Sequence, residues 1–131
     1  MTHYKLVLEY DGAAYHGWQE QPGGPVTVSG AVRDAMARLT GERPRLDAAG
    51  RTDAGAHSLG QTISFNLEGN IDPDRLAHSL NAVLPRDIAV REAAAVEPGF
   101  HARFSARRRI YRYLVENRME RGALLRDRAW H

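Results

Sequence analysis

The chain has 131 residues, of which 43% are hydrophobic and 26% charged, with no cysteine and a formal net charge of +2. This length and composition predict one domain with its own core, and they exclude disulfides and thiolate metal sites. No apolar run approaches the roughly 20 residues that cross a bilayer, and no signal segment precedes the first strand pattern, so we expect a cytoplasmic protein with no membrane contact.

The first half of the chain predicts a strand, a helix and a second strand. Apolar residues alternate over residues 4–10, which is typical of a strand, and a loop rich in glycine and proline follows. Thr27 or Ser29 can cap a helix that Gly41 ends, because the apolar side chains between them recur at the spacing of one helical face. A short strand is expected over residues 45–49.

The second half predicts three more strands and another helix. Residues 61–67 alternate as a strand, Asp72 and Pro73 begin a helix that Pro85 closes, and residues 88–96 and 107–116 alternate again. This order predicts an α+β fold, a ferredoxin-like split βαβ antiparallel sheet with both helices on one face and an additional strand. The other face stays open for water, a second domain, another subunit or RNA.

The hexapeptide Gly-Arg-Thr-Asp-Ala-Gly, residues 50–55, lies on the connection between two predicted strands. Asp53 can bond the backbone that follows it and Gly55 can adopt a positive φ, so a structural turn is the commonest interpretation. However, a hairpin needs only about two to five residues, and an aspartate held outward beside an arginine is how a carboxylate nucleophile is kept ionised. The polar side chains that cluster here are Arg51, Asp53, His57 and Gln61.

Other sequence signals for catalysis are weak. His16, His57 and His101 do not have the spacing of metal ligands, so no metal is expected. The glycines match neither phosphate-binding nor dinucleotide-binding patterns, and no Gly-x-Ser-x-Gly element is present. We therefore expect no cofactor.

Basic charge is concentrated near the end of the chain. Residues 100–131 carry nine arginines against three acids, whereas residues 1–99 carry nine basic residues against 13 acidic ones. Arginine suits contacts to phosphate and stacking on bases, so the final segment is where a polyanion such as nucleic acid would bind. A solvated face on a terminal strand explains the same pattern about equally well.

The predicted last strand carries two tyrosines on one face. Tyr111 and Tyr113 alternate with apolar neighbours, so one face of this strand should meet the core and the other should lie on the open side of the sheet. The pair fits ordinary β propensity. It also fits a ring that stacks on a base, in a site bordered by Arg107 and Arg109.

Four motifs, in this order, resemble the tRNA pseudouridine synthase A family. They are YDGAAYHGWQEQ at 10–21, GRTDAGAH at 50–57, LNAVLPRDI at 80–88 and FHARFSARRRIYRY at 100–113. The resemblance spans essentially the whole chain but only the first half of a usual family member. It implies that residues 1–131 form an N-terminal domain with the catalytic aspartate, that the second domain is absent, and that this chain alone is weakly active or inactive.

The resemblance also implies a reaction, the isomerisation of uridine to pseudouridine in the anticodon arm of tRNA without cofactor or metal, by a homodimeric enzyme. It assigns Asp53 as the nucleophile, with attack at the ribose anomeric carbon or at C6 of uracil both open. It assigns Arg51 to hold the flipped nucleotide, and Tyr111 to pack on the target uracil as a candidate relay for its C5 proton.

We expect further RNA contacts from Arg103, Arg107, Arg109, His57 and Gln61, because extruding a base costs a few kcal/mol that contacts to the base and its backbone must offset. Two other functions fit the same sequence. One is a non-catalytic RNA-binding module that uses the same sheet face, and the other is a ferredoxin-like domain whose open face serves only oligomerisation.

Overall fold

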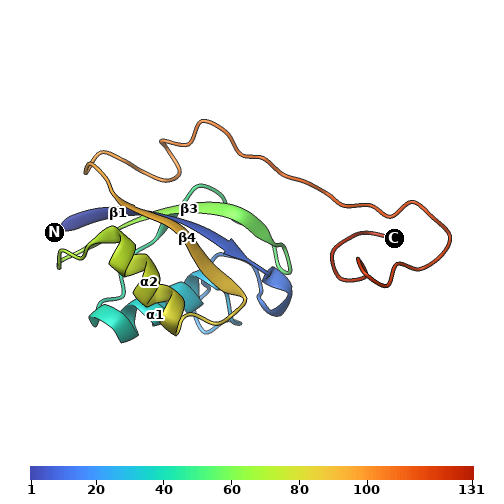
Figure 1. Ribbon diagram of the computed structural model, residues 1–131, viewed down its shortest axis with the longest axis horizontal. Coiled ribbons are helices and arrows are strands. Elements are labelled where there is room, and N and C mark those ends of the chain that lie inside the picture. The colour runs from blue at the N-terminus through green and yellow to red at the C-terminus, as the bar shows by residue number, and fades with distance from the viewer.

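A computed structural model describes all 131 residues. Its sheet has the strand order β2-β3-β1-β4, with every neighbouring pair antiparallel. Helices α1 and α2 both cover one face of this sheet (Figure 1), so the predicted α+β split βαβ fold is confirmed. The elements are β1 (Thr2–Tyr10), the short 3-10 helix η1 (Gly12–Ala14), α1 (Val28–Thr40), β2 (Asp47–Ala48), β3 (Ser58–Leu67), α2 (Pro73–Val83) and β4 (Ile88–Ala95).

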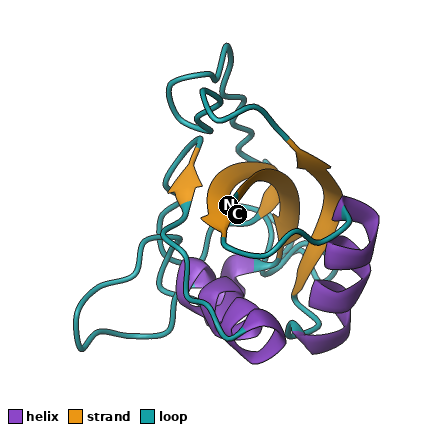
Figure 2. Ribbon diagram, turned by 90° about the vertical axis from the view of Figure 1, so that its left-hand side faces the viewer, coloured by secondary structure: helices purple, strands orange, loops and turns teal.

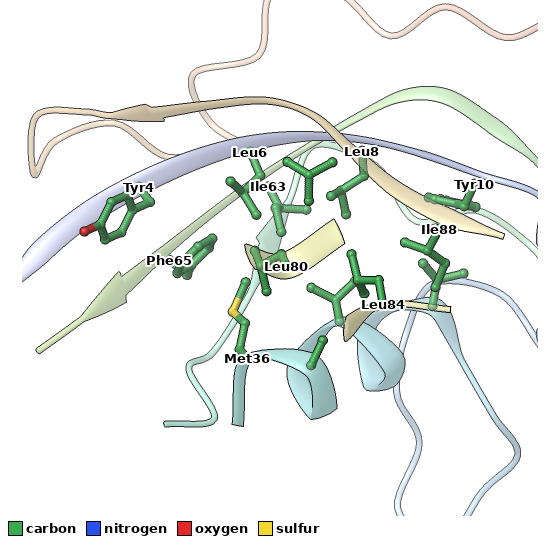
Figure 3. Packing of buried hydrophobic residues seen from close by; sticks show 14 of the residues in the cluster. Tyr4, Leu6, Leu8, Tyr10, Met36, Ile63, Phe65, Leu80, Leu84 and Ile88 are labelled. Atoms are coloured by element: carbon green, nitrogen blue, oxygen red, sulfur yellow. The ribbon is translucent and has the colours of Figure 1, made fainter. Parts of the chain in front are cut away.

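The core lies between the sheet and the two helices. Because side chains alternate across a strand, β1 and β3 each turn one apolar row inward, and their register sets Leu6 opposite Ile63. The rings of Tyr4 and Phe65 stack with centroids 5.7 Å apart. Figure 3 shows these rows above Met36 of α1 and Leu80 of α2.

Both helices begin at the predicted caps. Thr27 accepts a hydrogen bond from the Gly30 N–H at 3.2 Å, and Asp72 accepts one from the Arg75 N–H at 3.2 Å. Gly41 adopts the left-handed conformation, with φ of 79°, that ends α1. Neither helix is long enough and apolar enough to cross a membrane.

After β4 the chain crosses the face of the sheet opposite the helices (Figure 1). Ala102 is buried there, and its N–H donates a hydrogen bond to the Ser64 hydroxyl at 3.0 Å. Figure 2, viewed from the side, shows this loop above the strands and the helices below them. Part of the face expected to be open is therefore covered by the chain itself.

The predicted strand over residues 107–116 is wrong. The segment runs away from the sheet, and its only ladder contact is an isolated bridge between Val115 and Trp130. Neither of its faces meets the core, since Ile110 and Tyr113 are 83% and 92% exposed. The alternating pattern is present, but a strand also needs backbone pairing with a neighbouring strand, and no such pairing forms here.

The final residues close into a loop. The Trp130 N–H donates to the Leu114 carbonyl and the Glu116 N–H donates to the Trp130 carbonyl, both at 2.8 Å. Arg128 returns to the body of the molecule, where it pairs with Asp11. Several large apolar side chains of this loop are exposed, among them Met119 and Leu124.

Candidate functional site

The hexapeptide connects β2 to β3 and turns at its aspartate. The Ala56 N–H donates to the Asp53 carbonyl at 3.0 Å, which closes the turn. Gly55 has a φ of 79°, as the sequence predicted, and this conformation strains most other residues. The turn therefore fixes the direction in which Asp53 leaves the backbone.

The loop after β1 holds the hexapeptide from one side. The Trp18 N–H donates to the Thr52 carbonyl and the Gly55 N–H donates to the Tyr15 carbonyl, both at 3.1 Å. The buried Tyr10 hydroxyl bonds the Thr52 hydroxyl at 2.8 Å. Burial raises the pKa of Tyr10, so this hydroxyl stays neutral and able to donate. These contacts make the residues flanking Asp53 part of the rigid framework.

Gln61 holds the hexapeptide from below. Its side-chain amide donates to the Gly50 carbonyl at 2.6 Å, and the Gly50 N–H donates back to its side-chain oxygen at 3.3 Å. Gln61 is buried. The sequence predicted it as an RNA contact, and the structure places it beneath the loop, where its polar atoms serve the backbone.

The Asp53 side chain points to solvent. It is exposed, and its carboxylate makes no hydrogen bond and no ion pair in the structure. Arg51 is exposed and equally unbonded. Asp53 is therefore not a brace for its own loop, and its oxygens are accessible to a ligand.

Tyr111, from the C-terminal segment, lies beside Gly50 at the start of the hexapeptide. Its hydroxyl would be 3.4 Å from a Cβ built on Gly50, and the residue is 70% exposed. Arg109 holds this segment in place, because its guanidinium donates to the carbonyls of Ala49 and Arg103. The structure thus brings the segment around Tyr111 next to the hexapeptide without any strand pairing.

The remaining predicted arginines differ in their surroundings. Arg103 lies over the Phe104 ring, with its guanidinium carbon 5.6 Å from the centroid. Arg107 is exposed and makes no side-chain hydrogen bond or ion pair. Arg109 is already bonded to backbone, so Arg103 and Arg107 are the more available of the three for a phosphate.

Both ring nitrogens of His57 have protein partners. Nδ1 lies 3.1 Å from an Asp11 carboxylate oxygen and 2.9 Å from the Gly12 N–H, and Nε2 lies 3.2 Å from the Arg128 guanidinium. His57 therefore connects the end of the hexapeptide region to the loop after β1 and to the C-terminal loop. No three His, Asp or Glu side chains come together in a way that could hold a metal ion.

The contact between Asp11 and Arg128 should depend on pH. The Ala13 N–H and then the Arg128 guanidinium lower the pKa of Asp11 below its ordinary value of 3.8. A lowered folded-state pKa stabilises the fold above the ordinary value, and this contribution is lost as the pH falls through the folded value. The C-terminal loop should therefore stay attached at neutral pH and loosen only in acid, below the ordinary aspartate value of 3.8.

We expect Asp11→Asn to reproduce this loosening at pH 7, with amide exchange at Glu116 and Trp130 faster by up to about fivefold, since an exposed ion pair contributes about 0.2–1 kcal/mol. Hydrogen exchange read by mass spectrometry measures it. Glu97→Gln, at an exposed acid whose side chain has no partner, is the matched control. Exchange that is the same in both variants and insensitive to acid would contradict the attachment.

Sequence reasoning missed the residues that position the hexapeptide. The sequence pattern places Tyr10 at the end of a strand and Gly12 and Trp18 in the loop that follows. All three contact residues about 40 positions later in the chain. The signal that could have found them is the unusual number of aromatic and glycine residues in one loop. Buried aromatic side chains in a loop indicate that the loop is packed.

Comparison with known proteins identifies the family of this chain. A family model described as tRNA pseudouridine synthase matches residues 6–105, which run from within β1 to beyond β4 and include the whole hexapeptide region. The chain belongs to the tRNA pseudouridine synthase family. The match covers every residue named above as holding the loop except Arg109 and Arg128.

The chain is similar to curated relatives along nearly all of its own length. The tRNA pseudouridine synthase A of Moorella thermoacetica is 50% identical over 129 residues, covering 97% of this chain and 52% of the relative. Those of Acetivibrio thermocellus and Geobacter sulfurreducens are 44% and 45% identical over 131 residues. The chain spans about half the length of the curated relatives it matches.

Proposed function

We propose that this chain carries the aspartate-bearing half of a site that converts uridine to pseudouridine in the anticodon arm of tRNA. The observation that carries the proposal is the Asp53 carboxylate. It is exposed and unbonded on a turn that β1, β3 and Gln61 hold rigidly, inside the segment that matches the family.

The proposed reaction needs a nucleophile, and an exposed carboxylate can supply it. The bond between N1 of uracil and C1′ of the ribose breaks, the base rotates while bound, and C5 bonds to C1′. The proton on C5 is lost and N1 gains one, so the reaction is an isomerisation with no net redox change. A carboxylate that attacks C1′ displaces the uracil and is itself displaced when C5 bonds to C1′. A carboxylate that adds to C6 of uracil is eliminated again after the base has rotated. Either route divides the reaction into easier steps.

Arg51 and Tyr111 have supporting roles in this proposal. Arg51, one residue before Thr52, would bind a phosphate of the flipped nucleotide, because its guanidinium has no protein partner. Tyr111 would pack on the uracil, because its ring is exposed beside Gly50. Arg103 and Arg107 would contact the neighbouring backbone of the RNA.

We further propose that the chain by itself is weakly active or inactive. Asp53 and Arg51 both face open solvent here, and electrostatic stabilisation of a transition state weakens in a site that water fills. A second domain would close the site in the longer relatives. The homodimer and the cytoplasmic location expected from the sequence stay predictions.

A pseudouridine assay on unmodified tRNA transcripts tests the proposal. With protein in molar excess we expect slow conversion confined to the anticodon arm, and tRNA affinity that falls steeply with salt. A rate typical of enzymes, about 1 per second or more, would contradict the weak activity. Salt-independent binding, or none, would contradict the role in RNA modification.

The alternative is a non-catalytic RNA-binding module. The openness of the site around Asp53 favours it, because nothing in the structure shields the carboxylate from water. In that case tRNA binds but no pseudouridine forms, even when the remaining half of the Moorella thermoacetica relative is fused to this chain. Conversion by the fused protein would exclude this alternative.

A further inference from the structure

A pocket of about 320 Å³ opens at the β2 edge of the sheet, between α1, β2 and the turn at residues 101–104. Arg51 lies on its wall, so the pocket adjoins the hexapeptide. Its volume is within the range of about 300–1,000 Å³ found for small-molecule sites. Four arginines and two carboxylates line it, which leaves the wall positive; these are Arg33, Arg45, Arg51, Arg103, Glu20 and Asp47.

Only one of the four arginines has a guanidinium that is fully occupied by protein partners. Arg33 pairs with Glu20 and donates to the Pro44 carbonyl, which ties α1 to the chain before β2. The Arg45 side chain is 89% exposed, and its only ion pair is a 3.4 Å contact with Asp47. Arg51 and Arg103 have no ion pair at all. The pocket therefore presents guanidinium groups that an anion can bind.

The pocket also has an aromatic wall. Phe104 is 77% exposed, and one face of its ring stacks on His101 with centroids 4.3 Å apart. His101 is held in turn by Asp47, 3.3 Å from its Nε2. The ring is thus fixed in orientation although it is exposed. A fixed, exposed aromatic ring beside guanidinium groups is how proteins stack a base of single-stranded RNA.

We propose that this pocket binds one unpaired nucleotide adjacent to the target uridine. Its base would replace the Arg103 guanidinium over the Phe104 ring, and that guanidinium would turn to bind the phosphate together with Arg45. The inference rests on the proposed function, because Arg51 would bridge the two nucleotides. The pocket offers an aromatic ring to a base and guanidinium groups to the phosphate next to it. A base and a phosphate recur in every nucleotide of an RNA strand. It is specific for unpaired RNA, since a base within a duplex cannot expose its face.

The test uses an anticodon stem-loop RNA with 2-aminopurine next to the target uridine. Stacking on an aromatic ring should quench its fluorescence when the protein binds. Phe104→Leu should remove the quenching and weaken the affinity at least about fivefold, because base stacking on an aromatic ring contributes about 1–3 kcal/mol per base. Arg45→Gln should lower the slope of log affinity against log salt by about 0.7, the value for one phosphate of a single strand.

Arg75→Gln is the matched control, since it makes the same charge change at an exposed side chain on α2, outside the pocket. We expect this variant to bind as the wild type does. Melting temperatures within about 2 °C of wild type would show that Phe104→Leu is folded, as expected for an exposed residue.

Three results would overturn the proposal. They are emission unchanged on binding, quenching retained in Phe104→Leu, and an Arg45→Gln salt slope equal to that of Arg75→Gln. These are distinguishable from failure of the proposed function, in which the wild-type protein would not bind the RNA or no pseudouridine would form. A fourth such result is a Phe104→Leu protein that binds with wild-type affinity and still forms pseudouridine, because it would leave the proposed function intact and exclude the nucleotide-binding role of the pocket.

Discussion

Replacing Asp53 by alanine is expected to abolish pseudouridine formation while leaving tRNA affinity within about twofold of wild type. Removing a nucleophile eliminates the covalent route, and losses of about 1,000-fold or more are usual when a group of this kind is removed. Binding is preserved because the carboxylate makes no bond in the folded protein. Its removal also takes one negative charge away from a basic surface, so affinity should not fall.

The measurement has two parts. Conversion is followed with protein in excess over the tRNA transcript, in this chain and in the same chain fused to the remaining half of the Moorella thermoacetica relative. Asp53→Asn is the isosteric variant and should be as inactive as the alanine variant. Asp127→Ala removes an exposed acid whose only partner is Arg126 at 3.8 Å, and should convert as wild type does. If the fused Asp53→Asn protein kept full activity, the nucleophile assignment would be wrong.

Gly12→Ala is expected to destabilise the fold by about 2–3 kcal/mol and to slow conversion. Gly12 is buried, and a Cβ there would overlap the carbonyl oxygen of Ala56. The obstacle is the Ala56 backbone and no flexible side chain, so the clash can be relieved only by moving η1 away from the hexapeptide. Overpacking of this kind costs about 1–3 kcal/mol. That movement would also break the bond from the Gly12 N–H to His57.

Urea unfolding measures the stability change, and the pseudouridine assay measures the loss of activity. Gly69→Ala is the control, because a Cβ there meets nothing within 4 Å and its φ is ordinary. That variant should stay within about 0.5 kcal/mol of wild type. Equal stability of the two alanine variants would mean that the loop after β1 does not hold the hexapeptide.

The parts of the fold that follow from local chemistry could be predicted from the sequence. Thr27, Gly41 and Asp72 act within one helical turn of themselves, so the helix ends could be located without knowing the tertiary structure. The strands at 4–10 and 61–67 could be predicted because each turns one apolar row to the same core.

The segment at residues 107–116 shows where this reasoning fails. Its alternating pattern is real, but whether it pairs is decided by a neighbouring strand that no local pattern reveals. Arg109 donates to backbone carbonyls through its side chain, which attaches the segment without a ladder. Three contacts at the site were beyond sequence reasoning for the same reason. Gln61 to Gly50, His57 to Asp11 and Arg128 to His57 join residues that are 11, 46 and 71 positions apart.

The two sides of the candidate site are anchored very differently. Asp53 sits on backbone that is bonded to two strands and to a packed loop, whereas Tyr111 depends on the Arg109 side chain for its place. A pull on the C-terminal part of the chain would displace the tyrosine first and leave the aspartate where it is. The aspartate is thus the fixed reference point of the site, whereas the segment that carries Tyr111 is attached through arginine side chains and can detach while the sheet and helices stay folded.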